Sequence, residues 1–305
     1  MRLPLLASFP ALAVLAMPAL SARQDPASPA ALADARAALG GDAALGAVTS
    51  FVVTGSLVHN TSGVRLQSDI EIDCVVPSQY VRVERRVASR GPLGSFVITS
   101  WHGFNVDTLI NRTEAPGADI PVVIDPNPPT TPQEADDRAA KGLAGQRRAF
   151  AKLALALFAT TFKVYPVTFT AAASPNPAET GAVFDVAGAD GLAFQLAFDA
   201  ATRLPARISW MAKPIVSATI VHTTTVTSRG DVVSGPPGTL PPGDPTAGLA
   251  EVPWQQSIGD FRVESGLNLP HRLTTTVDGK PYEDIKIDKY KINVKIDPKK
   301  FKADR

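Results

Sequence analysis

The sequence predicts a mainly β protein with helices, built on one large, strongly curved antiparallel sheet of about 11–12 strands. Three observations predict it. Apolar and polar residues alternate over many short segments, turn residues fill most of the gaps between those segments, and one long apolar segment with helical character interrupts them midway. A sheet of this size curls, and its apolar concave face then has to be covered. The helices are the predicted cover.

The first residues predict export. Residues 1–22 are typical of a signal peptide, because Arg2 gives a short positive start and residues 3–20 are almost entirely apolar. Three prolines interrupt this run, which disfavours a continuous membrane-spanning helix. Cleavage before or after Ala22 both remain open. Because the only cysteine is Cys74, no lipid-bearing cysteine follows the run, and we expect a soluble periplasmic protein that is not a lipoprotein.

Two short helices and a hairpin are predicted next. Ser28-Pro29 opens a helix and Gly40-Gly41 closes it, after which Asp42 is expected to cap a second short turn. Period-two alternation then predicts a half-buried strand at residues 64–74, following a strand at 51–59 across a turn at 60–63. Its apolar side is formed by Val64, Leu66, Ile70, Ile72 and Cys74. A further strand contains Val81 and Val83 in alternation with Arg82 and Glu84, and two more are predicted at residues 96–101 and 105–110, joined across His102-Gly103.

The helical insertion is predicted at residues 131–162. Thr131 and Glu134 match a capping box, with Pro132 at the first helical position. The second part, residues 149–162, is nearly all apolar and about 14 residues long, which is too short to cross a bilayer. We therefore expect one exposed end and one buried end, with the apolar part acting as a lid over the sheet.

The remaining segments predict more antiparallel strands. A meander is expected over residues 163–171, 181–187, 192–199, 206–211 and 215–227. A flexible Pro/Gly loop at about 228–252 follows, and three last strands are predicted at 255–264, 269–277 and 281–290, the final pair joined by Asp278-Gly279. The lysine-rich tail from residue 280 onward also carries interleaved acids, which is typical of a solvated strand edge.

Charge and composition exclude several classes of function. The chain has 30 basic and 29 acidic residues, and loss of residues 1–22 removes only Arg2, which leaves 29 of each and no net charge. Nucleic-acid binding requires a concentrated positive field, so we expect no nucleic-acid partner. One cysteine excludes an internal disulfide framework and multi-cysteine metal sites.

No constellation in the sequence predicts chemistry. The four histidines, His59, His102, His222 and His271, lie far apart and lack metal-ligand spacing. There is no Gly-x-Ser-x-Gly elbow and no phosphate-binding loop, and Cys74 lies on the apolar side of its strand. Asp69, Glu71 and Asp73 alternate along one strand face, which favours a solvated outer surface over a pair of catalytic acids. The sequence therefore predicts no catalytic residues, no metal, no cofactor and no enzyme activity.

Large apolar residues supply the candidate ligand site. Ordinary core packing explains any one of them, but as a group they suit the wall of a cavity between the sheet and the helix. The predicted cavity-lining residues are Trp101, Phe150, Leu153, Leu157, Phe158 and Trp210.

Several local phrases together resemble the superfamily of LolA-like and LppX-like envelope proteins, relatives of the outer-membrane lipoprotein-sorting proteins. They are Ala38-Leu39-Gly40-Gly41, Phe198-Asp199 with Leu204-Pro205, Leu267 to Arg272 (Leu-Asn-Leu-Pro-His-Arg), and Asp297-Pro298 with Phe301. The resemblance implies one half-barrel domain over residues 29–302, lined with apolar residues and closed by helices, that shelters acyl chains in the periplasm. This chain is longer than the carrier and adds the Pro/Gly loop.

Two functions from different classes are compatible with these features. The first is a non-catalytic periplasmic carrier of a lipid, a lipoprotein acyl chain or another hydrophobic ligand, without a transmembrane segment in the mature chain. The second is a cell-envelope scaffold that fills the cavity with its own side chains and binds a protein partner in the envelope.

Overall fold

The computed structural model describes residues 29–61, 64–89, 94–116, 131–162, 166–173, 181–189, 191–215, 224–226, 232–234, 246 and 248–303. The predicted signal peptide at 1–22 lies outside these ranges, as does most of the Pro/Gly loop predicted at 228–252. Within the described ranges, no helix has both the length and the apolar character of a membrane span.

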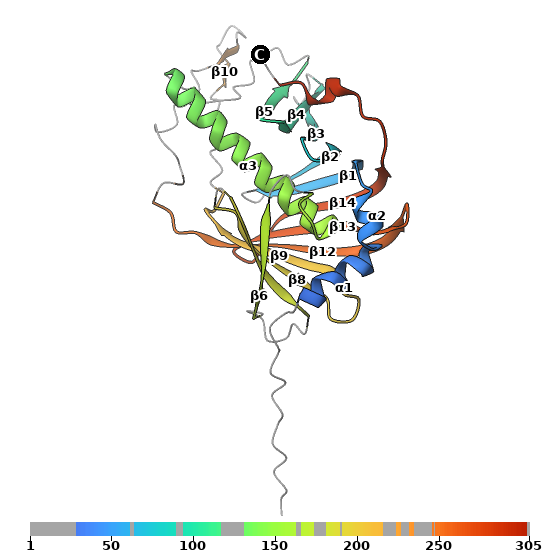
Figure 1. Cartoon of the computed structure of the whole chain (residues 1–305). Coiled ribbons are helices and arrows are strands. Elements are labelled where there is room, and N and C mark those ends of the chain that lie inside the picture. Colours follow the sequence, from blue (N-terminus) through green and yellow to red (C-terminus); the bar gives the residue numbers. More distant parts are fainter. Residues whose placement is uncertain are drawn as a thin grey trace, which may run out of the picture.

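Twelve strands form one antiparallel sheet that is not closed, which confirms the predicted fold class (Figure 1). The order is β5-β4-β3-β2-β1-β14-β13-β12-β9-β8-β7-β6, so the last three strands lie in the middle. The strands are β1 (Ser50–Thr61), β2 (Val64–Val75), β3 (Gln79–Ser89), β4 (Ser95–Asn105), β5 (Thr108–Glu114), β6 (Val167–Ala172), β7 (Val183–Gly188), β8 (Ala193–Phe198), β9 (Pro205–Ala212), β12 (Val252–Glu264), β13 (Leu267–Val277) and β14 (Lys280–Ile292).

Tight turns set the register of the predicted hairpins. Asp278 and Gly279 both have positive φ, at 50° and 72°, as a two-residue turn between β13 and β14 requires. Thr61 pairs with Val64 at the tip of the β1–β2 hairpin. Turn residues between alternating segments are thus sufficient to predict both hairpins.

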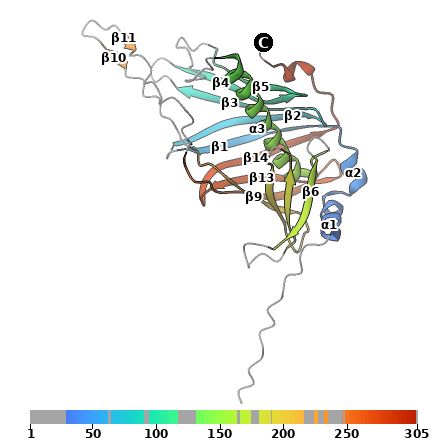
Figure 2. The ribbon, with the colours of Figure 1, turned by 60° about the vertical axis from the view of Figure 1, so that its left-hand side comes forward.

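A single long helix, α3 (Pro132–Phe158), crosses one face of the sheet, as Figures 1 and 2 show. Its start is as predicted: the Thr131 side chain accepts a hydrogen bond from the Glu134 backbone N–H, at 3.2 Å, and Pro132 is the first helical residue. We call the sheet face against α3 the inner face. The helix is exposed at its start and buried from Phe150 to Phe158, which is the division that the sequence predicts.

The main core lies between α3 and the inner face. Phe158 packs against Phe51 of β1 with ring centroids 5.3 Å apart, and Phe150 contacts Tyr80 and Phe104. Helices α1 (Pro29–Leu39) and α2 (Asp42–Gly46) close one end of this core with Ala35, Leu39 and Leu45. The predicted cap by Asp42 is not formed, because Gly41 is the N-cap and Asp42 is already helical; its carboxylate lies 3.8 Å from Arg36 instead.

The opposite, outer face carries a second core under the C-terminal segment. The short 3-10 helix η2 (Pro298–Phe301) brings Phe301 and the preceding Ile296 against Val52, Val81 and Val83. This corrects the prediction that the lysine-rich tail is a solvated strand edge, because β14 pairs with both β1 and β13 and the residues after it cover the sheet.

The prediction that Asp73 lies on a solvated outer surface is wrong. Its side chain is fully buried beneath η2, where the Lys300 Nζ lies 2.8 and 3.0 Å from its two carboxylate oxygens. The same ammonium donates to Glu71. Asp69, which follows the predicted alternation, remains exposed.

The strand boundaries around Gly103 differ from the prediction. His102-Gly103 is not a turn but the interior of β4, and the turn falls at Val106 and Asp107. A Cβ at Gly103 would lie 2.0 Å from the carbonyl oxygen of Tyr80, so glycine is needed there for the close approach of β3. Of the strand predicted at 215–227, Ile215 lies outside any strand, and Thr224–Val226 form β10, which pairs with β11 (Val232–Ser234) in a separate two-stranded sheet.

Candidate functional site

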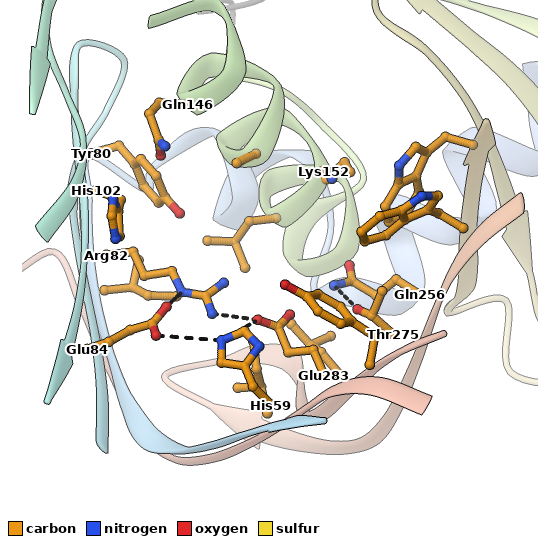
Figure 3. A pocket seen from close by; sticks show the side chains of 18 residues that line it. His59, Tyr80, Arg82, Glu84, His102, Gln146, Lys152, Gln256, Thr275 and Glu283 are labelled. Atoms are coloured by element: carbon orange, nitrogen blue, oxygen red, sulfur yellow. Dashed lines mark hydrogen bonds and ion pairs between the residues drawn. The ribbon is translucent and has the colours of Figure 1, made fainter. Parts of the chain in front are cut away.

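A cavity of about 320 Å³ lies between α3 and the inner face of the sheet (Figure 3). Its walls come from α3 and from strands that are distant in the sequence. They are His59, Ile72, Tyr80, Arg82, Glu84, His102, Gln146, Ala149, Lys152, Leu153, Trp210, Trp254, Gln256, Leu273, Thr275, Tyr282, Glu283 and Ile285. The lining is therefore mixed, with aliphatic and aromatic side chains beside a group of charged ones.

The charged floor of the cavity is centred on Arg82. This guanidinium lies 2.5 Å from Glu283 through one terminal nitrogen and 2.8 Å from Glu84 through Nε. His59 Nε2 lies 3.6 Å from Glu84 and 3.8 Å from Glu283, so the imidazole bridges the two carboxylates. Strand pairing brings these four side chains together. Arg82 and Glu84 lie two residues apart on β3 and therefore share one face of the sheet, while His59 of β1 is directly paired with Glu283 of β14.

These contacts fix the ionisation of the floor. Burial alone would raise the pKa of Glu84, but the hydrogen bond to His59 and the charge of Arg82 outweigh it and lower that pKa to about 2. Burial alone would lower the pKa of Arg82, yet the charges of Glu283 and Glu84 raise it. Arg82 and Glu84 are therefore charged at neutral pH.

Lys152 and two tryptophans form the opposite wall. The Lys152 ammonium lies 3.9 Å from the centre of the Trp210 ring, within range of a cation–π contact. Trp210 and Trp254 are cross-strand partners on β9 and β12, and their rings stack with centroids 5.7 Å apart. Burial lowers the pKa of Lys152 to about 8, although Glu283 acts in the opposite direction.

Within the described part of the chain, two buried polar atoms of uncharged side chains at the cavity have no hydrogen-bond partner: Trp254 Nε1, a donor, and Gln256 Oε1, an acceptor. The amide nitrogen of Gln256 is engaged, since it donates to Thr275 Oγ1 at 3.4 Å. Buried polar atoms in folded proteins are almost always paired, so unpaired ones on a cavity wall indicate a place for a polar ligand group.

A second cavity of about 360 Å³ adjoins the first. The two share Ala149, Lys152 and Trp210, and the second is also lined by the exposed residues Met211 and Lys213. Lys152 therefore stands where the inner cavity meets a hollow that reaches the surface.

The six residues predicted to line one cavity lie in three different places. Leu153 and Trp210 line it. Phe150, Leu157 and Phe158 are fully buried in the main core, where neighbouring side chains contact them on all sides. Trp101 lies on the outer face with Val83 and Ile110, and the Arg112 guanidinium stacks 4.3 Å above its ring.

The charged half of the site is not predicted by the sequence. The alternation in β3 predicts that Val81 and Val83 face a core. They do, but it is the second core on the outer face, beneath η2. Arg82 and Glu84 consequently point inward. Both faces of β3 are covered by other parts of the chain. The alternation of its residues therefore does not tell which face points toward α3 and which toward η2.

Two of the four histidines, His59 and His102, are brought to the same cavity from β1 and β4. His102 Nδ1 forms a hydrogen bond with Asn111 Oδ1 at 3.0 Å, and burial lowers the pKa of the His102 imidazole. Among the residues with described positions, no group of three or more His, Cys, Asp or Glu side chains has the arrangement of a metal site. Cys74 is buried in the main core as predicted, and burial raises the pKa of its thiol.

The chain matches no protein-family model and no curated protein. It is similar to the crystal structure of a LolA superfamily protein from Nitrosomonas europaea (10% identity, 91% of this chain and 98% of that one, TM-score 0.43). An outer membrane lipoprotein-sorting protein domain from Vibrio parahaemolyticus is also similar (9%, 83% and 88%, TM-score 0.38), as is a DUF1329 family protein from Desulfovibrio piger (6%, 90% and 96%, TM-score 0.41).

The first two of these structures belong, by their descriptions, to the group of proteins that the sequence motifs resemble. At TM-scores this low, they assign neither a ligand nor an activity to this chain.

Proposed function

We propose that this chain is a non-catalytic binding protein of the periplasm that holds one amphiphilic molecule in the cavity beneath α3. The observation that carries the proposal is the cavity of about 320 Å³, whose wall combines apolar side chains with unpaired polar atoms of Trp254 and Gln256. A purely apolar ligand would leave those atoms unsatisfied, at a cost of about 1–3 kcal/mol each. A ligand with both an apolar body and a polar group contacts the apolar wall and offers a partner to at least one of these atoms.

The size of the cavity limits the ligand to a single small molecule or one chain. Ligand pockets range from about 300 to 1,000 Å³, and this one is at the lower end. The buried half of α3 leaves no further room, because Leu155, Leu157 and Phe158 are fully packed against the sheet. This volume favours one acyl chain over a lipid with several chains.

The charged floor supports binding rather than catalysis. A general acid or base at neutral pH needs a pKa near 7, whereas Glu84 has a pKa of about 2 and Arg82 stays protonated. Both groups are already paired with each other. Their role in this proposal is to orient polar groups of the ligand.

Calorimetric titration with two single-chain amphiphiles, dodecanoate and dodecanol, tests the proposal. We expect one molecule of at least one of them to bind per protein. Ala149→Phe, which places a ring in the cavity from α3, should weaken that binding by at least about tenfold, since it removes the volume available to the ligand.

Ala140→Phe is the matched control, because Ala140 is exposed on the same helix and should leave binding unchanged. Absence of binding to the wild-type protein, or equal binding by the Ala149→Phe variant, would contradict the proposal. A protein partner that is retained by both variants would instead favour the scaffold function.

A further inference from the structure

Lys152 is a partly buried cation without an anionic partner. It lies on the cavity side of α3, and among the described residues its ammonium forms no hydrogen bond or ion pair within 4 Å; its contact is the ring face of Trp210, at 3.9 Å. A buried charge without a counter-ion is costly, so such groups are normally paired. The acidic side chain whose charge raises its pKa, Glu283, is held by Arg82 and His59.

Around the cavity, the groups that have no partner among residues of described position are mainly donors. Lys152 offers N–H groups, Trp254 offers its indole N–H, and Gln256 offers one carbonyl oxygen. The two carboxylates of the cavity, Glu84 and Glu283, are both within ion-pair distance of Arg82. An anionic ligand group therefore meets, in Lys152, a cation that forms no ion pair within the described part of the chain, whereas a cationic group meets carboxylates that already face Arg82 and His59.

Resting on the proposed function, we propose that Lys152 receives the anionic head of the ligand, and that the natural ligand is a single-chain carboxylate. The head would lie where the inner cavity joins the hollow at Met211 and Lys213. The chain would extend inward along Leu153, Leu273 and Ile285, which line the inner cavity.

Titration of Lys152 gives this proposal a pH dependence. Its pKa is lowered by burial to about 8, and the charged groups that act on it are Glu283 from β14, Arg148 from α3 itself and Arg82 from β3. The carboxylate binds the protonated form, so affinity is full below pH 8 and falls as the pH rises through 8 and above. Other titratable side chains also line the cavity, namely His59, His102, Glu84, Tyr80 and Tyr282. Variants of Lys152 therefore have to show that the pH dependence of binding comes from this lysine.

The test is calorimetric titration of dodecanoate, dodecanol and dodecylamine into the wild-type protein and the Lys152→Met, Lys152→Arg and Lys141→Met variants. Lys141 is exposed on the same helix and is the matched control. We expect Lys152→Met to weaken dodecanoate binding about tenfold or more, because a charge-assisted hydrogen bond is lost. Dodecanol binding should change clearly less, since its uncharged hydroxyl forms no ion pair with the ammonium.

Lys152→Arg and Lys141→Met should retain tight dodecanoate binding. Between about pH 7 and 9.5 the wild-type affinity for dodecanoate should fall several-fold, and Lys152→Met should remove that fall. Equal losses for dodecanoate and dodecanol, or no loss for dodecanoate, would overturn the assignment of Lys152 and leave the proposed function standing. Failure of the wild-type protein to bind any of the three probes would instead overturn the proposed function.

Discussion

At the scale of single residues, Arg82 holds the charged floor of the cavity together. It is in contact with both Glu84 and Glu283, and all three side chains are mostly buried. We expect Arg82→Met to lower the free energy of unfolding by about 3–5 kcal/mol at pH 7, because two carboxylates lose their shared counter-charge. Urea unfolding followed by circular dichroism measures this directly.

Arg85→Met on the same strand is the control. Arg85 pairs with Glu71 at 3.1 Å but is 44% exposed, so its loss should cost no more than about 1 kcal/mol. The pKa of Glu84 is lower in the folded protein than its ordinary value of 4.5, so the stabilisation it provides is present above pH 4.5 and is lost as the pH falls toward 2. The difference between wild type and Arg82→Met should therefore shrink in acid; a difference that persists undiminished at about pH 3 would contradict this account.

The alternation within each strand identifies which side chains share a face, but not which side of the sheet each set faces. It places Ile72 and Cys74 on the inner side of β2, where they lie. It does not place Arg82, because the register pairs Ile72 with Arg82 and so puts the charged set of β3 on the same face as the apolar set of β2. Register between strands is a long-range property that one strand's pattern does not contain.

At the scale of elements, the C-terminal segment is anchored to the outer face by one ion pair and one aromatic ring. Lys300 contacts the fully buried Asp73, and Phe301 is 1% exposed beside it. We expect Lys300→Met to lower the free energy of unfolding by about 2 kcal/mol, because Asp73 is left buried without its partner.

The double variant Lys300→Met/Asp73→Asn should recover part of that loss, since it removes the uncompensated charge. Lys299→Met is a suitable control because Lys299 is exposed in the same short helix. Chemical denaturation of the three variants measures the effect. A loss for Lys299→Met equal to that for Lys300→Met would show that the Asp73 contact is not responsible.

The elements differ in how well the sequence predicts them. Helix α3 is fixed by local signals, a threonine cap and a long apolar run. Its start agrees with the prediction, but it ends at Phe158 instead of residue 162, where Ala159 takes a left-handed conformation. The C-terminal segment has no such signal, because its interleaved charges look like a solvated edge until β14 is seen between β1 and β13. The turn predicted at Gly103 is wrong because a glycine that admits a neighbouring strand looks the same in sequence as one that bends the chain.

At the scale of the whole molecule, the curved sheet and its helical cover follow from the sequence, and the chemistry of the space between them does not. The apolar half of α3 packs solidly on the sheet, while the adjoining turn, with Ala149 and Lys152, stands over a polar cavity. The cavity gathers side chains from strands at both ends of the chain, as His59 and Glu283 illustrate. Such a site becomes visible only once the strand order is known.

The central claim is that this cavity, and no other surface, receives the ligand. The chain has three tryptophans: Trp210 and Trp254 line the cavity, and Trp101 lies on the outer face. The most direct test is a nuclear magnetic resonance titration of ¹⁵N-labelled protein with dodecanoate, following the three indole N–H signals. We expect the Trp210 and Trp254 signals to shift, because both rings line the cavity that the ligand fills, and the Trp101 signal to stay in place. A shift confined to Trp101, or saturation of binding without a shift at Trp254 or Trp210, would contradict the account.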